Sequence, residues 1–158
     1  MKTKIKKIRR GGIYGESWKD PTYTTNYVVL VGYTMHDVIP VWLQLSGRKK
    51  GIDVVDTDAA FTDDVEMEDG SLKVFICFDF DATPGLVAHE CNHAVNMTFK
   101  FHGIVLDVNN DEHQSYYLQS LVDRCWTVIS GYEKVLTSKL KDERVSVEPG
   151  KDPDRKAI

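Results

Sequence analysis

The sequence predicts a single α+β domain, in which a small mixed or antiparallel sheet packs on two helices. Three observations favour this class. Segments rich in β-branched and aromatic residues, at 23–33 and 72–80, are typical of strands. A segment with start and stop signals for a helix follows at 83–103. After residue 110, apolar residues recur at steps of three and four, which predicts a second, longer amphipathic helix.

The 158 residues are enough for one domain with its own core, and neither a repeat nor a Ser/Pro-rich linker divides them. The domain is expected to span residues 1–140. The charged residues 141–158 are expected to form a disordered tail. The net charge of −4 is unlike that of a nucleic-acid-binding domain, so a nucleic-acid partner is not expected.

Two features predict the compartment. The N-terminal charges are not followed by the apolar core of a signal peptide, and no apolar run approaches the roughly 20 residues that span a bilayer. The three cysteines, Cys77, Cys91 and Cys125, show no paired spacing. We therefore expect a cytoplasmic protein without membrane contact, whose thiols are free and buried as small hydrophobes.

The first 20 residues combine a basic run with a glycine-rich stretch, and they are expected to form a basic arm or a strand. At the edge of a sheet, such positive charge protects a strand against unwanted pairing. Residues 23–33 then form the first clear strand.

The stretch from residue 37 to residue 70 carries weaker signals. Residues 37–45 are an apolar run in which Pro40 predicts an edge strand, a bulge or two short pieces. Residues 52–55 fit a short strand or the start of a helix. Residues 56–70 are acidic and end in a turn signal.

A buried strand and a helix follow. Residues 72–80 are mostly apolar on both faces, which predicts a strand covered on both sides. Thr83 is a good N-cap, Pro84 suits the first helical position, and Gly103 is a plausible residue just past the helix end. One side of this helix should face the core, and its residues are Val87, Cys91, Ala94, Val95 and Thr98.

The second helix is expected to begin at Asn109 or Asn110, after a loop at 104–110, and to reach Lys139 or Lys141. Gly131 lies inside it, where glycine costs about 1 kcal/mol relative to alanine and can mark a bend.

The first of these helices carries the motif His89-Glu90-Cys91-Asn92-His93, or H-E-x-x-H. Residues four apart lie on one side of a helix, so His89 and His93 can both reach one metal ion. Glu90 projects beside them, where it can act as general base on a metal-bound water. The alternative is two surface histidines on an amphipathic helix. Because the residues between the histidines include small and apolar ones, the metal-binding interpretation is favoured.

A catalytic zinc site needs a third protein ligand and an open fourth position. His102 has the wrong spacing, because it falls on about the opposite side of the helix from the motif. Asp111-Glu112-His113, at the start of the next helix, is the better source. Glu112 is the predicted ligand, and Asp111 and His113 are the alternatives. A different role for Glu112 is a capping box with Asn109.

The motif followed by D-E-H-Q-S-Y-Y-L on the next helix resembles small zincin-like proteins encoded in bacteriophage genomes. More distantly, it is similar to intracellular gluzincin-type peptidases of the ImmA/IrrE kind. The resemblance covers about residues 72–126. It implies that Glu112, followed by Gln114 and Tyr116, is the third ligand of a zinc ion held with His89 and His93. Gln114 stands where those peptidases often have asparagine.

The resemblance implies a zinc metallopeptidase in which Glu90 passes the proton of the zinc-activated water to the leaving amine. The expected partners are a peptide or protein substrate, held along the strand at 72–80, or phage virion proteins. The expected location is the host cytoplasm or the virion. Tyr116, Tyr117 or His113 can stabilise the oxyanion, although packing is the favoured role for both tyrosines. The alternative function is a phage virion or assembly protein that keeps the zinc-binding fold without protease activity.

Overall fold

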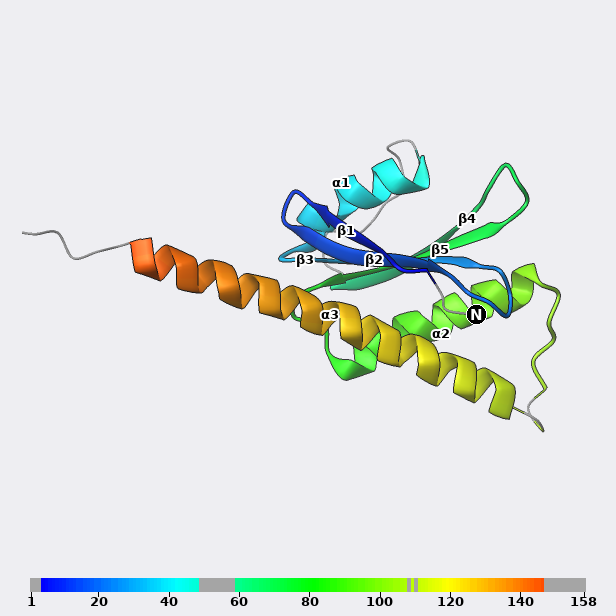
Figure 1. Cartoon of the computed structure of the whole chain (residues 1–158). Coiled ribbons are helices and arrows are strands. Elements are labelled where there is room, and N and C mark those ends of the chain that lie inside the picture. Colours follow the sequence, from blue (N-terminus) through cyan, green and yellow to red (C-terminus); the bar gives the residue numbers. More distant parts are fainter. Residues whose placement is uncertain (1–3, 49–58, 108, 110, 147–158) are drawn as a thin grey trace, which may run out of the picture.

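The computed structural model describes residues 4–48, 59–107, 109 and 111–146. Within them, three helices pack on a mixed five-stranded sheet with the strand order β1-β2-β3-β5-β4 (Figure 1). Strands β3 and β5 are parallel, and every other neighbouring pair is antiparallel. In chain order the elements are β1 (Lys6–Arg10), β2 (Ile13–Lys19), β3 (Asn26–Gly32), α1 (Met35–Ser46), β4 (Ala60–Glu66), β5 (Leu72–Asp79), α2 (Pro84–Phe101) and α3 (Glu112–Ser146).

The sheet separates two apolar layers. Helix α1 covers one face, where Trp42 packs with buried residues of β3 and β5 such as Leu30 and Phe75. Helices α2 and α3 cover the other face, so that Val95 and Ile129 share a core with Val29 and its neighbours (Figure 1). This arrangement confirms the α+β class and the mixed sheet. Within the described chain, none of the helices is long and apolar enough to cross a bilayer.

The basic N-terminal segment forms a strand. β1 and β2 make a hairpin that turns at Gly11 and Gly12, whose φ angles of 55° and 84° are costly for other residues. β1 lies at one edge of the sheet and is mostly exposed. The edge strand protected by charge is therefore the interpretation of this segment that the structure supports.

The prediction of a strand around Pro40 is wrong, because these residues form α1. A capping box starts the helix: the Thr34 amide and hydroxyl both donate to the Asp37 carboxylate, and the Asp37 amide donates to the Thr34 carbonyl. Met35, Val38 and Trp42 recur at helical spacing and are buried. Burial of this apolar side outweighs the backbone hydrogen bond that Pro40 removes inside the helix.

The acidic segment contains a strand that the sequence did not predict. β4 pairs antiparallel with β5 and forms the second edge of the sheet. β5 is buried between β3 and β4, which confirms the prediction of an internal strand at 72–80. The predicted short element at residues 52–55 lies outside the described residues.

Helix α2 follows its signals closely. Thr83 is the N-cap, and its hydroxyl accepts a hydrogen bond from the Leu86 backbone amide. The helix ends at Phe101, and Gly103 has a left-handed φ of 68°. The whole predicted core side is buried, namely Val87, Cys91, Ala94, Val95 and Thr98.

Helix α3 differs from the prediction at both ends. It begins at Glu112, after Asp111, and it continues to Ser146. Gly131 serves close packing, because a Cβ atom there would lie 2.8 Å from the Tyr14 ring. The glycine thus lets α3 approach β2.

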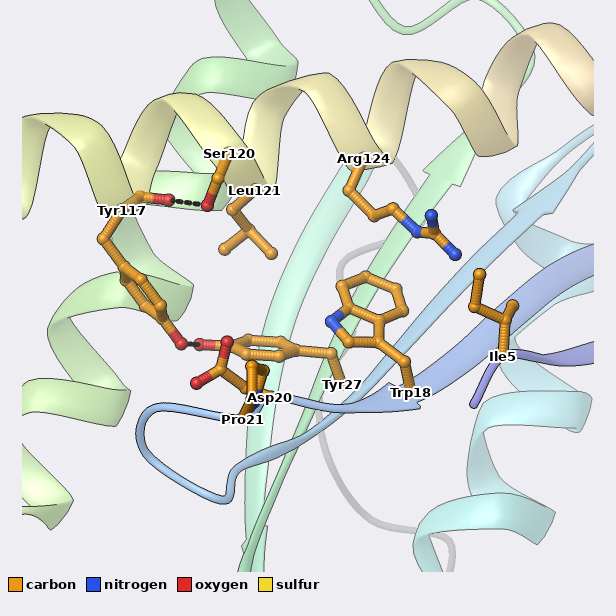
Figure 2. A pocket seen from close by; sticks show the side chains of 9 residues that line it. All are labelled: Ile5, Trp18, Asp20, Pro21, Tyr27, Tyr117, Ser120, Leu121 and Arg124. Carbon is orange, nitrogen blue, oxygen red and sulfur yellow. Dashed lines mark hydrogen bonds between the residues drawn. The ribbon is translucent and has the colours of Figure 1, made fainter. Parts of the chain in front are cut away.

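A chain of hydroxyl groups ties α2, α3 and β3 together. The Thr98 hydroxyl donates its proton to the Ala94 carbonyl over 2.9 Å. It can therefore only accept from Tyr27, whose hydroxyl donates to it over 2.6 Å. Tyr117 in turn donates to the Tyr27 oxygen over 3.0 Å (Figure 2). Burial raises the pKa of Tyr27 from 10.0 to about 12. The network therefore depends on a neutral Tyr27.

We expect alkaline pH to destabilise the protein through Tyr27. Its pKa is higher in the folded state than in the unfolded chain, so its contribution is complete below pH 10 and is lost as pH rises towards about 12. The loss should reach roughly 3 kcal/mol in the free energy of unfolding. Urea unfolding at several alkaline pH values measures it. The Tyr27→Phe variant should lose less stability over the same window, and equal losses would contradict the assignment.

Candidate metal centre

His89 and His93 form a pair on the exposed side of α2. Their Nε2 atoms lie 3.0 Å apart, and their ring planes are nearly perpendicular, at 84°. The helix produces this arrangement, because residues four apart stand one turn above each other. Both side chains are exposed, so the pair is accessible from solvent.

The donor atoms of this pair suit zinc. Zinc binds imidazole nitrogen at about 2.0–2.1 Å, and two such ligands of a tetrahedral ion lie about 3.3 Å apart. The Nε2 separation of 3.0 Å is within a few tenths of an ångström of that value. The two imidazoles therefore fit two positions on a single ion after a small rotation of the rings.

Glu90 lies between the histidine pair and the sheet. It is turned by about 100° from His89 around the helix and points towards β4. The side chain is buried, with 6% of its surface exposed. The Thr62 hydroxyl on β4 lies 2.7 Å from Glu90 Oε2 and 3.0 Å from the Glu90 carbonyl oxygen, and it can donate to either. Thr62 thus fixes one carboxylate oxygen of Glu90, next to the histidine pair.

The structure does not bring Glu112 to the histidines. Helices α2 and α3 are antiparallel, with Cys91 against Cys125 and Phe99 against Tyr117. This register places residue 123 level with His93, so Glu112 lies 11 residues, or about 16 Å, further along α3. No third His, Cys, Asp or Glu among the described residues joins the pair in a group that could hold a metal.

His113, an alternative ligand, and His102, which was set aside for its spacing, both lie near the C-terminal end of α2, away from the histidine pair. His113 Nε2 shares a hydrogen bond with the Tyr23 hydroxyl, and its ring stacks on Phe99. His102 lies against Tyr23 as well, with 5.4 Å between ring centres. These aromatic contacts hold the start of α3 against the β2–β3 connection.

The two tyrosines considered for the oxyanion do not lie at the pair. The Tyr117 hydroxyl binds Tyr27, as predicted for a packing residue, and Tyr116 is 68% exposed at the start of α3. Asp111 caps this end of the helix, where its carbonyl accepts from the Ser115 amide.

Sequence reasoning missed the strand beside the pair. Residues 72–80 were expected to border the cleft, but β5 is internal and β4 is the edge strand next to α2. Thr62, which holds Glu90, was not singled out. The available signal was the alternation of Ala60, Thr62 and Asp64 with Phe61 and Val65, which the acidic composition obscured.

The cysteines are free and buried, as predicted. Cys91 faces α3, away from the two histidines, and its Sγ lies 3.5 Å from Cys125 Sγ. Burial raises the pKa of the Cys125 thiol, and hydrogen bonding to Cys91 adds to the effect. Both thiols therefore act as packing groups.

A pocket of about 220 Å³ opens elsewhere, between α3 and the ends of β2 and β3 (Figure 2). The Arg124 guanidinium borders it, paired with Glu16 at 2.8 Å and lying 5.2 Å from the centre of the Trp18 ring. Neither His89 nor His93 lines this pocket. The pocket is thus separate from the histidine pair.

Comparisons of the chain with family models, with curated proteins and with solved structures gave no match. The geometry of α2 and β4 therefore carries the functional interpretation of the histidine pair.

Proposed function

We propose that this protein is a zinc-dependent peptidase with a zincin-like arrangement of α2 and the edge strand β4. The observation that carries the proposal is the pair of Nε2 atoms, 3.0 Å apart, on the same helix turn as Glu90, whose buried carboxylate is held by Thr62. Two histidines and a glutamate in this order supply two metal ligands and a general base for metal-assisted hydrolysis. The resemblance to phage-encoded zincin-like proteins supports the same activity.

Each residue of the motif has a distinct role in the proposal. His89 and His93 hold the ion through their Nε2 atoms. When bound, zinc lowers the pKa of a water ligand towards 7. Glu90 takes a proton through the carboxylate oxygen that Thr62 does not hold, and it returns the proton to the leaving amine. Thr62 keeps the Glu90 side chain from rotating away from the pair.

Glu112 is the third ligand expected from the sequence. In the register of α2 and α3 it lies about 16 Å along α3 from the level of His93, so it does not reach the ion in this arrangement. Metal analysis of the Glu112→Ala and Asp111→Ala variants decides whether either residue takes part. Unchanged zinc content in both would exclude both residues as ligands.

The experiment that tests the proposal is metal analysis by mass spectrometry of the purified protein, dialysed against excess zinc. We expect close to one zinc ion per chain, and we expect the His89→Ala and His93→Ala variants to lose it. Each substitution removes one ligand from an exposed part of α2, so the fold should be retained. Circular dichroism measures independently whether each variant keeps its secondary structure.

The His36→Ala variant is a matched control, because His36 is an exposed histidine of α1 on the opposite face of the sheet. It should bind as much zinc as the unmodified protein. If the unmodified protein binds no zinc, the proposal of a zinc peptidase is contradicted. Zinc binding without hydrolysis of any peptide would favour the alternative, an assembly protein that keeps the metal.

A further inference from the structure

The two edges of the sheet carry opposite charge. β1, at one edge, reads Lys6-Lys7-Ile8-Arg9-Arg10, and its four basic side chains are exposed. β4, at the other edge, contains Asp63, Asp64 and Glu66. An edge strand has unpaired backbone groups that can bind another strand. The sheet thus has one basic and one acidic edge, and each can accept a strand.

The hydrogen-bonding pattern shows which backbone groups of β4 point outward. The Asp79 amide donates to the Ala59 carbonyl over 2.9 Å, so odd-numbered residues of β4 bond to β5. The backbone groups of Thr62, Asp64 and Glu66 therefore point away from the sheet. Arg48 bears this out, because its guanidinium binds the outward Asp64 carbonyl at 2.7 Å.

The backbone groups of β1 alternate in the same way. Its hairpin with β2 closes on the two-residue turn Gly11-Gly12, so Arg10 and Ile13 form a bonded pair. Bonded pairs alternate along an antiparallel ladder. The backbone groups of Lys7 and Arg9 are therefore the outward ones.

These outward residues match each other when β1 of one copy is laid antiparallel to β4 of another. Placing Arg9 opposite Asp64 sets outward backbone groups against outward backbone groups. Every neighbouring position then also matches in charge or in apolar character. The resulting pairs are Lys7 with Glu66, Ile8 with Val65, Arg9 with Asp64, and Arg10 with Asp63.

The two sides of the sheet agree with this register. Ile8 and Val65 both pack on the layer of α1. Arg9 lies over Tyr14, which belongs to the core below α2 and α3. Asp64 is on the same face of β4 as Thr62, which contacts Glu90 of α2. Arg9 and Asp64 therefore both face the layer of α2 and α3. β1 and β4 run in opposite directions within one chain, because β1, β3 and β5 share a direction. A second copy in the same orientation therefore brings its β1 to β4 antiparallel.

We propose that copies of this chain associate head to tail, with β1 of one copy extending the sheet of the next at β4. The contact combines backbone hydrogen bonds with opposite charges in cross-strand pairs. Two β1 edges repel each other, as do two β4 edges, so only the mixed contact forms. Such a heterologous contact produces a ring if it closes and a filament if it does not. This association does not depend on metal binding.

Arg48 shows that the β4 edge binds a guanidinium. It holds both oxygens of Asp63, at 2.7 and 2.8 Å, as well as the Asp64 carbonyl. Arg9 and Arg10 of the incoming strand would replace it. Arg48 thus competes with association, and the Arg48→Ala variant should associate at lower protein concentration than the unmodified chain.

Sedimentation velocity at low salt, over a range of protein concentrations, tests the proposal. The unmodified chain should form species larger than a monomer, and association should weaken roughly tenfold when salt screens the charges. A variant with Lys7→Glu and Arg9→Glu should stay monomeric, because acidic side chains at these two positions would stand opposite Glu66 and Asp64 of the next copy. A variant with Asp64→Lys and Glu66→Lys should also stay monomeric, because basic side chains at these two positions would stand opposite Arg9 and Lys7.

Mixing the two charge-reversed variants is the decisive step. The substituted positions 7 and 9 of one variant then meet the substituted positions 66 and 64 of the other with opposite charge, so the mixture should assemble again. The control variant, with Lys134→Glu and Lys139→Glu on exposed positions of α3, changes the net charge by the same amount as the β1 variant and should assemble like the unmodified chain. An unmodified chain that stays monomeric at every concentration, or a mixture that stays monomeric, would overturn the proposal.

Discussion

Replacing Glu90 with glutamine is expected to leave zinc binding intact and to lower the rate of peptide hydrolysis by roughly 10²–10⁴-fold. The amide has nearly the same shape as the carboxylate and can keep the contact with Thr62 at the surface of β4. It cannot take the proton of the attacking water. The substitution therefore separates proton transfer from metal binding, which depends on His89 and His93.

The measurement is the hydrolysis of fluorescein-labelled casein, followed for the unmodified protein and the variant at equal zinc content. Glu133→Gln is the matched control, because Glu133 is an exposed carboxylate on α3 outside the pair. It should hydrolyse casein at the unmodified rate. A Glu90→Gln variant as active as the unmodified protein would exclude Glu90 as the general base, and loss of zinc from it would mean that Glu90 is a ligand.

Gly15→Ala is expected to lower the free energy of unfolding by about 3 kcal/mol. An added Cβ would lie 2.4 Å from the Val29 carbonyl oxygen and 3.0 Å from the Leu30 side chain. The oxygen belongs to the backbone of β3, so it can move only if the pairing of β2 with β3 changes. In a chain of this length the melting temperature should fall by about 6–12 °C.

Gly85→Ala provides the opposite result. Gly85 is in the first turn of α2, and an added Cβ there meets nothing within 4 Å. Alanine favours the helix and restricts the unfolded chain, so this variant should gain up to about 1 kcal/mol. Calorimetry of the two variants beside the unmodified protein measures both effects. Equal shifts in the two variants would contradict the close approach of β2 and β3 at Gly15.

Helix α2 shows how far local signals can go. Thr83, Pro84 and Gly103 mark its ends, and the period of its apolar residues marks its buried side. Each of these signals acts through neighbours in the chain, so the sequence contains them in full. The same holds for the internal strand β5, whose apolar residues on both faces fit its place between two strands.

Helix α1 and strand β4 show where local signals fail. Pro40 argues against a helix interior, yet Val38 and Trp42 gain more from burial on the sheet than the lost hydrogen bond costs. Strand β4 is rich in aspartate, which is rare in strands, but an edge strand leaves room for charge. In both elements the deciding contacts come from distant parts of the chain.

In the candidate metal centre, too, some features follow from local geometry and others from tertiary packing. The sequence determines that His89 and His93 share one side of a helix and that Glu90 stands beside them, because helix geometry alone produces this spacing. It cannot determine how α3 slides along α2. The structure sets that register through Cys91 with Cys125 and Phe99 with Tyr117, and it thereby places Glu112 far from the pair.

By itself, the sequence determined the α+β class, the ends of α2, the two histidines and the neighbouring glutamate. Only the tertiary structure decided which strand lies beside Glu90, where Glu112 stands, and that the basic and acidic strands form opposite edges of one sheet. The physical reason is the range of the interactions. Helix caps and helical spacing are local, whereas strand order and helix register depend on side chains that meet only when the core is packed.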